Sequence, residues 1–354
     1  MARKTTIAVD VNPATRPIVT GTEIFTREVC ARLPAAAPEY RWRFFGSRPK
    51  ADLRMDVMVL PFWRMWSQIR LPIALAGERP DLLFVPGHVV PFAWPGKTLA
   101  VIHDLAFERH PEAYSLADRT YLRVTTRWAA VRCRLLIAVS ESTKEDLVDV
   151  YGVAPERIRV VPLGISPPST PSAPASRLDE LGVNGTFVLQ VGRVEARKNQ
   201  AAALAAVERL DGVNLVVAGP ERDHALSDQL RNSTQIRVLG TVDQPMLELL
   251  YKRAAAVIVP SLYEGFGLPV LEAMARGKVV VAAKASSLPE VGGEAALYFH
   301  PSDDPAQLAS VLDVALNDQP LRTRLARIAR ARAAKFTWDR TAAGVAEVIK
   351  ELVS

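Results

Sequence analysis

The sequence has few cysteines and no long apolar run, and both absences exclude whole classes of protein. Its two cysteines, Cys30 and Cys133, cannot build a disulfide framework or a zinc-ligand pattern. No apolar stretch approaches the ~18 residues of a membrane-spanning helix. The apolar stretch 7–11 is too short for the apolar part of a signal peptide. These absences predict a soluble, cytoplasmic protein.

A further absence concerns glycine after the first predicted strand. A dinucleotide-dependent oxidoreductase needs the pattern Gly-x-Gly-x-x-Gly there, followed ~20 residues later by an acidic residue. After residues 7–11 only Gly21 is present, which argues against that class of enzyme.

The length and the charge of the chain indicate how many domains it has and what kind of partner it binds. A chain of 354 residues with 49% hydrophobic residues suits two α/β domains with separate cores. The net charge of +6 is uneven, because residues 1–165 carry 23 Lys and Arg against 17 Asp and Glu, and the remainder carries 21 of each. This excess predicts an acidic partner for the first half: an anionic membrane, a phospholipid-linked acceptor or nucleic acid. A generally arginine-rich composition is the alternative.

Strand-like and helix-like segments alternate along the chain, which predicts parallel sheets covered by helices. The predicted strands are residues 7–11, 42–45, 57–60, 82–85, 99–102, 135–139, 158–161, 187–191, 213–218, 236–239, 257–259 and 279–282. The predicted helices are residues 22–33, 116–133, 142–151, 199–210, 245–254, 268–276, 305–316, 320–334 and 339–353. A stretch rich in proline and serine predicts a linker at 166–180 between domains 1–165 and 181–335. Two such units place a ligand cleft between the carboxyl ends of their strands.

Two glutamates, Glu264 and Glu272, frame a glycine-bearing loop that leads into the predicted helix 268–276. A helix N-terminus presents unpaired N–H groups and the positive end of its dipole, which suits a phosphate group. If the helix opens near Phe266, both carboxylates point into one crevice. A phosphate site with two carboxylates suits a nucleotide-sugar, because the diphosphate needs donors and the sugar hydroxyls need acceptors. The alternative is an ordinary loop with solvated glutamates.

A second loop carries two cations after the predicted strand 187–191. Gly192 lets the backbone turn, and Arg193 and Lys198 stand at the two ends of the loop. A planar guanidinium and a compact ammonium group are a suitable pair for binding a diphosphate. A solvated basic loop is the alternative.

Several motifs occur together in one order along most of the chain. They are Val139-Ser140-Glu141-Ser142-Thr143, residues 159–165, Gly192-Arg193 with Lys198-Asn199, residues 260–269 with Glu272-Ala273-Met274, and residues 287–291. This ordered set resembles the retaining glycosyltransferases of family 4, which have the GT-B fold of two Rossmann-like domains facing a central cleft. The resemblance also implies that residues 336–354 form a helix that crosses back to the N-terminal domain.

The resemblance implies roles for the residues of both loops. Glu264 matches the glutamate that lies near the transferred sugar, and Glu272 matches the one that binds the ribose. Arg193 and Lys198 match the two cations on the donor diphosphate. The implied donor-binding positions between the glutamates are Gly265, Phe266, Gly267, Leu268 and Val270, of which Gly267, Leu268 and Val270 offer amides to the distal phosphate and sugar.

Two positions in the first half complete the implied site. Gly21 matches a glycine-rich loop near the donor phosphate, although that loop often has two adjacent glycines and this one has a single glycine. His103 follows the predicted strand 99–102 and precedes Asp104. The resemblance implies that His103 contacts the C6 hydroxyl of the sugar or the reacting centre, and a purely structural histidine is the alternative.

The implied reaction is transfer of a hexose from a nucleotide-sugar to a glycan or lipid-linked glycan acceptor in cell-surface polysaccharide synthesis. Residues 107–112 and 287–290 resemble the mannosyltransferase-like branch, so GDP-mannose is favoured over a UDP-sugar. No Asp-x-Asp triplet is present to hold a divalent metal on a diphosphate, so we expect transfer without a metal ion or other cofactor. The alternatives are a UDP-sugar-dependent transferase and a non-catalytic partner subunit. Nucleic acid is not an expected partner of such an enzyme.

An aromatic and basic stretch at 61–72 bears on the acceptor. On a helix, Phe62, Met65, Trp66 and Ile69 would share one face. Such a face either dips into a membrane surface or packs against the core. The first alternative predicts peripheral contact with an anionic membrane at its inner face.

Overall fold

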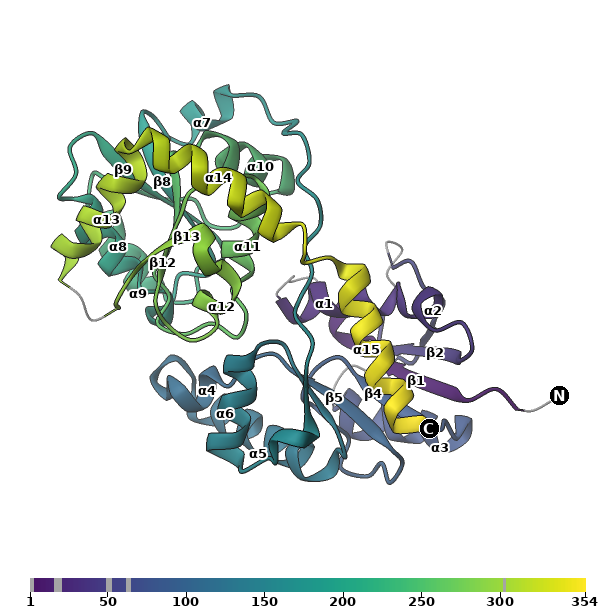
Figure 1. Cartoon of the computed structure of the whole chain (residues 1–354). Coiled ribbons are helices and arrows are strands. Elements are labelled where there is room, and N and C mark those ends of the chain that lie inside the picture. Colours follow the sequence, from purple (N-terminus) through teal and green to yellow (C-terminus); the bar gives the residue numbers. More distant parts are fainter. Residues whose placement is uncertain (1–2, 16–20, 49–52, 62–64, 302–303) are drawn as a thin grey trace. The chain divides into compact units, whose positions relative to one another are not determined.

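The computed structural model describes residues 3–15, 21–48, 53–61, 65–301 and 304–354. The chain divides into two compact units, each a parallel sheet covered by helices (Figure 1). Unit 1 consists of the described residues up to Gly164 together with Phe336–Ser354, and unit 2 is Ile165–Lys335. The architecture is that of two Rossmann-like α/β domains.

Unit 1 contains a seven-stranded sheet in the order β3-β2-β1-β4-β5-β6-β7. Its strands are β1 (Thr6–Asp10), β2 (Arg41–Gly46), β3 (Val57–Val59), β4 (Leu82–Val85), β5 (Thr98–Ile102), β6 (Leu136–Ala138) and β7 (Ile158–Val160). Every pairing is parallel, and β1, β4 and β5 are buried along their whole length. Continuous apolar strands of this kind are typical of parallel sheets covered on both faces.

Seven α-helices surround this sheet among the described residues of unit 1. They are α1 (Gly21–Cys30), α2 (Leu33–Ala36), α3 (Leu71–Glu78), α4 (Ala106–Arg109), α5 (Leu116–Arg132), α6 (Glu141–Tyr151) and α15 (Trp338–Val353), with the short turns η1 (Asn12–Thr15), η2 (Trp66–Arg70), η3 (Pro111–Ala113) and η4 (Pro155–Arg157). Ser140 caps α6 by accepting a hydrogen bond from the Thr143 amide at 3.0 Å.

The last helix, α15, packs against α1 and α2 and is therefore part of unit 1. The Thr341 hydroxyl donates to the Pro162 carbonyl at 2.8 Å. Gly164 lies so close to this helix that a Cβ there would be 2.2 Å from the Trp338 nitrogen. Only a residue without a side chain permits that approach.

Unit 2 contains a six-stranded parallel sheet in the order β10-β9-β8-β11-β12-β13. Its strands are β8 (Thr186–Val191), β9 (Val213–Ala218), β10 (Ile236–Val238), β11 (Ala256–Val259), β12 (Val280–Ala283) and β13 (Ala296–Phe299). Strands β8 and β11 are neighbours at the centre, so the loops that follow them emerge side by side at the carboxyl edge.

The helices of unit 2 follow the strands in turn. They are α7 (Ser176–Glu180), α8 (Gln200–Val207), α9 (His224–Arg231), α10 (Gln244–Arg253), α11 (Leu268–Ala275), α12 (Leu288–Gly292), α13 (Pro305–Asn317) and α14 (Gln319–Ala333), with the short turns η5 (Ala196–Lys198) and η6 (Gly293–Ala295). Helix α7 occupies the end of the predicted linker 166–180, and its Leu178 is buried. That end of the linker is therefore part of the folded unit.

The single helix face predicted at 61–72 is wrong. Phe62 lies outside the described residues, while Met65 is 62% exposed, Trp66 is 2% exposed and Ile69 is 44% exposed. Residues Trp66–Arg70 form a π-helical turn, whose i→i+5 spacing differs from the α-helical spacing that would align those side chains. Trp66 packs in the core, whereas Met65 and Ile69 lie on the surface.

Candidate active site

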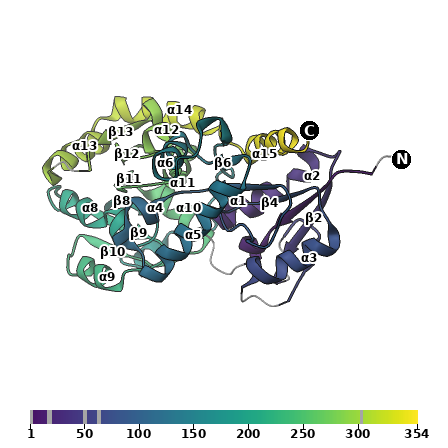
Figure 2. The same ribbon diagram turned by 90° about the horizontal axis from the view of Figure 1, so that it is seen from below.

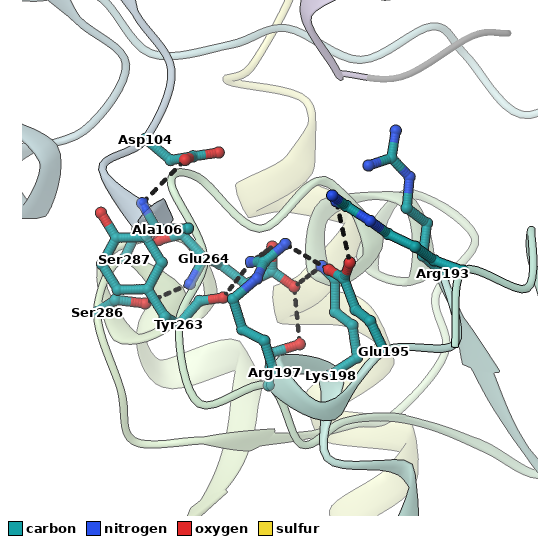
Figure 3. A network of polar contacts seen from close by, with 12 residues as sticks. Asp104, Ala106, Arg193, Glu195, Arg197, Lys198, Tyr263, Glu264, Ser286 and Ser287 are labelled. Carbon is teal, nitrogen blue, oxygen red and sulfur yellow. Dashed lines mark hydrogen bonds and ion pairs between the residues drawn. The ribbon is translucent and has the colours of Figure 1, made fainter. Parts of the chain in front are cut away.

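Glu264 lies in the loop between β11 and α11 and is held on all sides by hydrogen bonds (Figure 3). Its carboxylate accepts from the Ser261 hydroxyl at 2.7 Å and from the Lys198 ammonium group. Its backbone N–H donates to Ser286 Oγ, and its carbonyl accepts from Ser287 Oγ, both at 2.8 Å. The position of this carboxylate is therefore set before any ligand binds.

Arg197 joins the loop after β8 to the loop after β11. Its guanidinium donates to the Tyr263 carbonyl at 2.6 Å and to the Glu195 carboxylate at 2.7 Å. The same guanidinium lies 3.9 Å from Glu264 Oε2. The Leu262 amide donates back to the Arg197 carbonyl at 2.9 Å. These contacts hold Lys198 and Glu264 together although 66 residues separate them.

Glu264 is nearly buried, yet it is ionised at neutral pH. Burial by itself would raise the pKa of its carboxyl group, but the charges of Lys198 and Arg197 and the hydrogen bond from Ser261 hold the pKa below its ordinary value. The buried carboxylate is thus an acceptor of hydrogen bonds and not a proton donor.

The start of α11 offers two unused donors. Within the described part of the chain, the N–H groups of Gly267 and Leu268 have no hydrogen-bond partner. Gly267 has φ 102°, a backbone conformation that favours glycine, and a Cβ there would also crowd Leu288 Cδ2 at 2.9 Å. The Val270 amide differs from these two amides, because it already donates to the Gly267 carbonyl at 3.0 Å. Gly265 and the buried Phe266 connect Glu264 to this turn.

Glu272 belongs to a different polar cluster from Glu264. Helix α11 begins at Leu268, as the predicted bounds 268–276 have it and not near Phe266, and the Glu272 carboxylate accepts from the Tyr251 hydroxyl at 2.8 Å. The Tyr251 ring lies 4.5 Å from the Arg276 guanidinium carbon, and Arg276 pairs with the buried Glu248. Burial raises the pKa of Glu272 above its ordinary value.

The two cations predicted for the diphosphate are in different states. Lys198 is bound to Glu264, whereas the Arg193 side chain has no hydrogen bond or ion pair with any described residue. The Arg193 backbone is fixed instead, because its carbonyl accepts from Gln200 Nε2 at 2.7 Å. Arg193 is therefore the cation of this loop that remains available for an anion.

In unit 1, His103 follows β5 as predicted and makes a specific contact. Its Nε2 lies 2.8 Å from the Pro86 carbonyl oxygen, which accepts a hydrogen bond only when Nε2 carries a proton. Its ring meets Phe25 of α1 edge-on at 5.0 Å. Burial lowers the pKa of His103, against the opposing effects of Pro86 and Asp104. The imidazole is thus neutral at pH 7, with Nδ1 as an acceptor.

A second histidine lies close to His103 in unit 1. Burial lowers the pKa of His88 to about 4, with Asp104 acting in the opposite direction and His103 in the same direction. Its Nε2 is buried and has no hydrogen-bond partner in the described ranges. Gly21 is the first residue of α1, the helix that carries Phe25, and its neighbour Thr20 lies outside the described residues.

The sequence analysis missed Arg197, Ser261 and Glu195. Arg197 and Glu195 stand two residues apart in the predicted loop, and alternating opposite charges beside Lys198 were a signal for an ion pair. Ser261 precedes Glu264 by three residues and had no signal of its own.

The described residues form neither a metal-binding group nor a membrane-spanning helix. Within residues 3–15, 21–48, 53–61, 65–301 and 304–354, no three His, Cys, Asp or Glu side chains are grouped so that they could hold a metal ion. None of the helices formed by these residues has the length and apolar character needed to cross a bilayer.

Comparison with known proteins places both halves of the chain. Residues 19–167 match the family described as Glycosyltransferase Family 4, and residues 179–332 match Glycosyl transferases group 1. The chain is 30% identical to O-antigen chain mannosyltransferase B of Escherichia coli, over 82% of this chain and 79% of that protein. It is 31% identical to D-inositol 3-phosphate glycosyltransferase of Frankia alni, over 94% of this chain and 90% of that protein.

A solved structure is similar over nearly the whole length. The Anabaena protein Alr3699/HepE, in complex with UDP and glucose, has a TM-score of 0.78 and 20% sequence identity, covering 98% of this chain and 100% of that one. The similarity identifies the fold as GT-B.

Proposed function

The chain belongs to the glycosyltransferases that have the GT-B fold, and on that premise we propose that it moves a hexose from a nucleotide-sugar to a glycan or lipid-linked glycan acceptor. The observation that carries the proposal is the buried Glu264 carboxylate held between Lys198 and Ser261, next to the two unpaired amides at the start of α11. A diphosphate needs cations and N–H donors, and a sugar needs fixed acceptors. All three are present at one edge of the unit 2 sheet.

Each group then has a distinct task. Arg193 and Lys198 bind the diphosphate, and the Gly267 and Leu268 amides donate to its distal phosphate at the helix N-terminus. Ionised Glu264 accepts from hydroxyls of the sugar. Glu272, fixed by Tyr251, accepts from the ribose hydroxyls. His103, neutral at pH 7, offers Nδ1 to a sugar hydroxyl.

The proposed reaction retains the anomeric configuration and uses no metal ion. The bond between the anomeric carbon and the phosphate oxygen breaks, the bond to the acceptor oxygen forms on the same face, and the departing diphosphate takes the acceptor's proton. Arg193, Lys198 and the α11 amides stabilise the charge that develops on the leaving group. Analysis of the product's anomeric configuration by NMR tests retention, and transfer undiminished in EDTA tests metal independence.

GDP-mannose is the proposed donor. Residues 107–112 and 287–290 support it, as does the similarity to the Escherichia coli mannosyltransferase. The name of the Frankia alni relative points to D-inositol 3-phosphate as an acceptor, so this compound belongs in the acceptor assay. The alternatives are a UDP-sugar donor and a non-catalytic partner subunit.

Thermal unfolding with GDP and with UDP tests the proposal directly. A ligand at about 100 times its dissociation constant stabilises the folded protein by about 2.7 kcal/mol. We expect GDP to raise the unfolding temperature more than UDP does. Stabilisation by UDP alone would overturn the donor, and no response to either nucleotide, with no transfer from either sugar donor, would overturn the function.

A further inference from the structure

The loop between β8 and α8, which carries both cations of the candidate donor site, is held by two buried glutamines. Gln190 Nε2 donates to the Lys198 carbonyl at 2.8 Å, and Gln200 Nε2 donates to the Arg193 carbonyl at 2.7 Å. Gln190 lies on β8, and Gln200 is the first residue of α8. Figures 1 and 2 show these two elements close together in unit 2, and Figure 3 shows the side chains of Arg193 and Lys198.

The two hydrogen bonds cross over the loop. Gln190 precedes the loop and binds the carbonyl at its far end, eight residues along the chain. Gln200 follows the loop and binds the carbonyl at its near end, seven residues back. The backbone is therefore fixed at both cations, by two side chains that we call the glutamine pair.

Each member of the glutamine pair also has an unpaired oxygen. A backbone carbonyl only accepts hydrogen bonds, so each side chain must present its NH2 group there and direct Oε1 elsewhere. Gln190 is 3% exposed and Gln200 is 0% exposed, and neither Oε1 atom has a hydrogen-bond partner within the described ranges. A buried carbonyl oxygen without a partner destabilises a fold, and an apolar side chain of similar length would avoid this. The stability of the fold is therefore no reason by itself for glutamine at these positions.

We propose that the glutamine pair consists of positioning residues for the donor diphosphate. Two cations that bind one diphosphate must keep a fixed spacing, and less freedom is lost on binding when their backbone is already fixed. The Lys198 ammonium group is held by Glu264, whereas the Arg193 side chain has no partner among the described residues. The backbone bond from Gln200 is thus what limits where the Arg193 guanidinium can reach. This inference rests on the proposed function, because it assigns both cations to the donor diphosphate.

Methionine variants test the role of the glutamine pair in transfer. Methionine is unbranched and close to glutamine in length, but it cannot donate a hydrogen bond. We expect Gln190→Met and Gln200→Met to fold, with little change in urea denaturation, and to lower kcat/KM for transfer about tenfold each. The double variant should lose less than the product of the two single losses, since both bonds fix the same loop.

Nucleotide affinity separates positioning of the cations from a general loss of packing. Isothermal titration compares GDP with GMP, or UDP with UMP if the unmodified protein prefers uridine nucleotides. The cations act on the phosphates, so each variant should reduce the preference for the diphosphate over the monophosphate about fivefold. A general distortion of unit 2 would lower both affinities equally and leave this preference unchanged.

A matched control and a direct measurement on the loop complete the experiment. Gln235 Nε2 donates to the Val213 carbonyl at 3.1 Å, ahead of β10 and outside the donor loop, so Gln235→Met should leave transfer and nucleotide preference unchanged. Hydrogen exchange is measured at the Val194, Lys198 and Asn199 amides, which donate to backbone carbonyls. Exchange there should be faster in the variants of the glutamine pair and not in the control.

Three results would overturn the proposal: unchanged transfer, an unchanged preference for the diphosphate, or unchanged hydrogen exchange in the variants of the glutamine pair. Faster exchange in these variants, with neither nucleotide binding nor transfer by the unmodified protein, is a distinguishable result. It would overturn the proposed function, and the positioning role with it, while showing that the glutamine pair does hold the loop.

Discussion

The loops that follow the central strands of unit 2 hold Glu195 and Glu264 in ion pairs, whereas the corresponding loops of unit 1 hold neutral imidazoles. In unit 2, Glu264 is ionised between Lys198 and Arg197. In unit 1, His103 and His88 are uncharged, and the buried Nε2 of His88 has no partner in the described part of the chain. A paired site is assembled before its ligand arrives. A neutral, incompletely bonded site leaves its hydrogen bonds to be completed by the ligand.

The difference suggests a division of work. A charged diphosphate is recognised best by fixed charges and amides, and unit 2 has both. Hydroxyl groups of a sugar or an acceptor need weaker, directional partners, which neutral histidines provide. The four predictions that follow test this contrast.

The largest effect should come from breaking the second ion pair of unit 2. Arg276→Met leaves the buried Glu248 carboxylate without its cation, which should lower the free energy of unfolding by about 3–5 kcal/mol. Urea denaturation measures the change. The double variant Arg276→Met with Glu248→Leu should recover much of the loss, since an unpaired buried charge is the cause. Equal instability of the single and double variants would contradict this account.

Next in size is the effect of Lys198→Ala on transfer. Removing one group that stabilises charge in the transition state typically lowers kcat by about 10²–10³-fold. Steady-state transfer assays measure it, and Lys252→Ala, a lysine outside the Glu264 network, serves as the control. Glu264→Gln should fold and also lose transfer, because the amide cannot match the carboxylate's two acceptor oxygens. If either Lys198→Ala or Glu264→Gln transferred the sugar at the normal rate, the charged network would have no role in the mechanism.

The stability of the protein in acid tests whether His88 of unit 1 is neutral. The pKa of His88 is about 4 in the folded protein, against an ordinary value near 6.5. Between these two pH values, His88 binds a proton in the unfolded chain but not in the folded protein. Stability is therefore lost as pH falls from about 6.5 towards 4, by roughly 3 kcal/mol in total. His88→Asn should abolish this part of the pH dependence of urea denaturation. If the variant lost as much stability in acid as the unmodified protein, His88 would not be buried and neutral in the folded protein.

The smallest effect should come from removing the hydrogen bond between Tyr251 and Glu272. Tyr251→Phe removes one hydrogen bond to that carboxylate, which should weaken nucleotide binding by about 1 kcal/mol, or roughly fivefold. Isothermal titration with the preferred nucleotide measures it. Tyr298→Phe, which removes a bond to the Gly293 carbonyl in the same unit, is the control and should leave the affinity unchanged.

Much of the fold could be predicted from the sequence because buried parallel strands are continuous apolar runs. Strands β4 and β9 have the predicted bounds, 82–85 and 213–218. Strand β13 (Ala296–Phe299) was not predicted; it lies at the edge of its sheet, and its two central residues are half-buried. The prediction of one shared helix face at 61–72 was wrong because the spacing of apolar residues does not reveal a π-helical turn.

Residues of the site could be predicted only where the sequence of a single loop formed a recognisable pattern. Lys198 and Glu264 were both proposed for the donor, and the structure places them in contact. Arg197 was missed because its partner is the carbonyl of Tyr263, a backbone atom 66 residues away that no side-chain pattern encodes. The position of Glu272 depends on Tyr251 of α10, which lies 21 residues before it and outside the motif that contains both glutamates.

The return of α15 to unit 1 has a consequence for synthesis on the ribosome. Its buried residues Val345, Ile349 and Leu352 complete the first unit, yet they are translated after the whole of Ile165–Lys335. Unit 2 therefore emerges as a continuous segment that can fold as soon as it leaves the exit tunnel, while unit 1 waits with an uncovered apolar face on α1 and α2. The nascent N-terminal unit is thus the one with greater need of a chaperone.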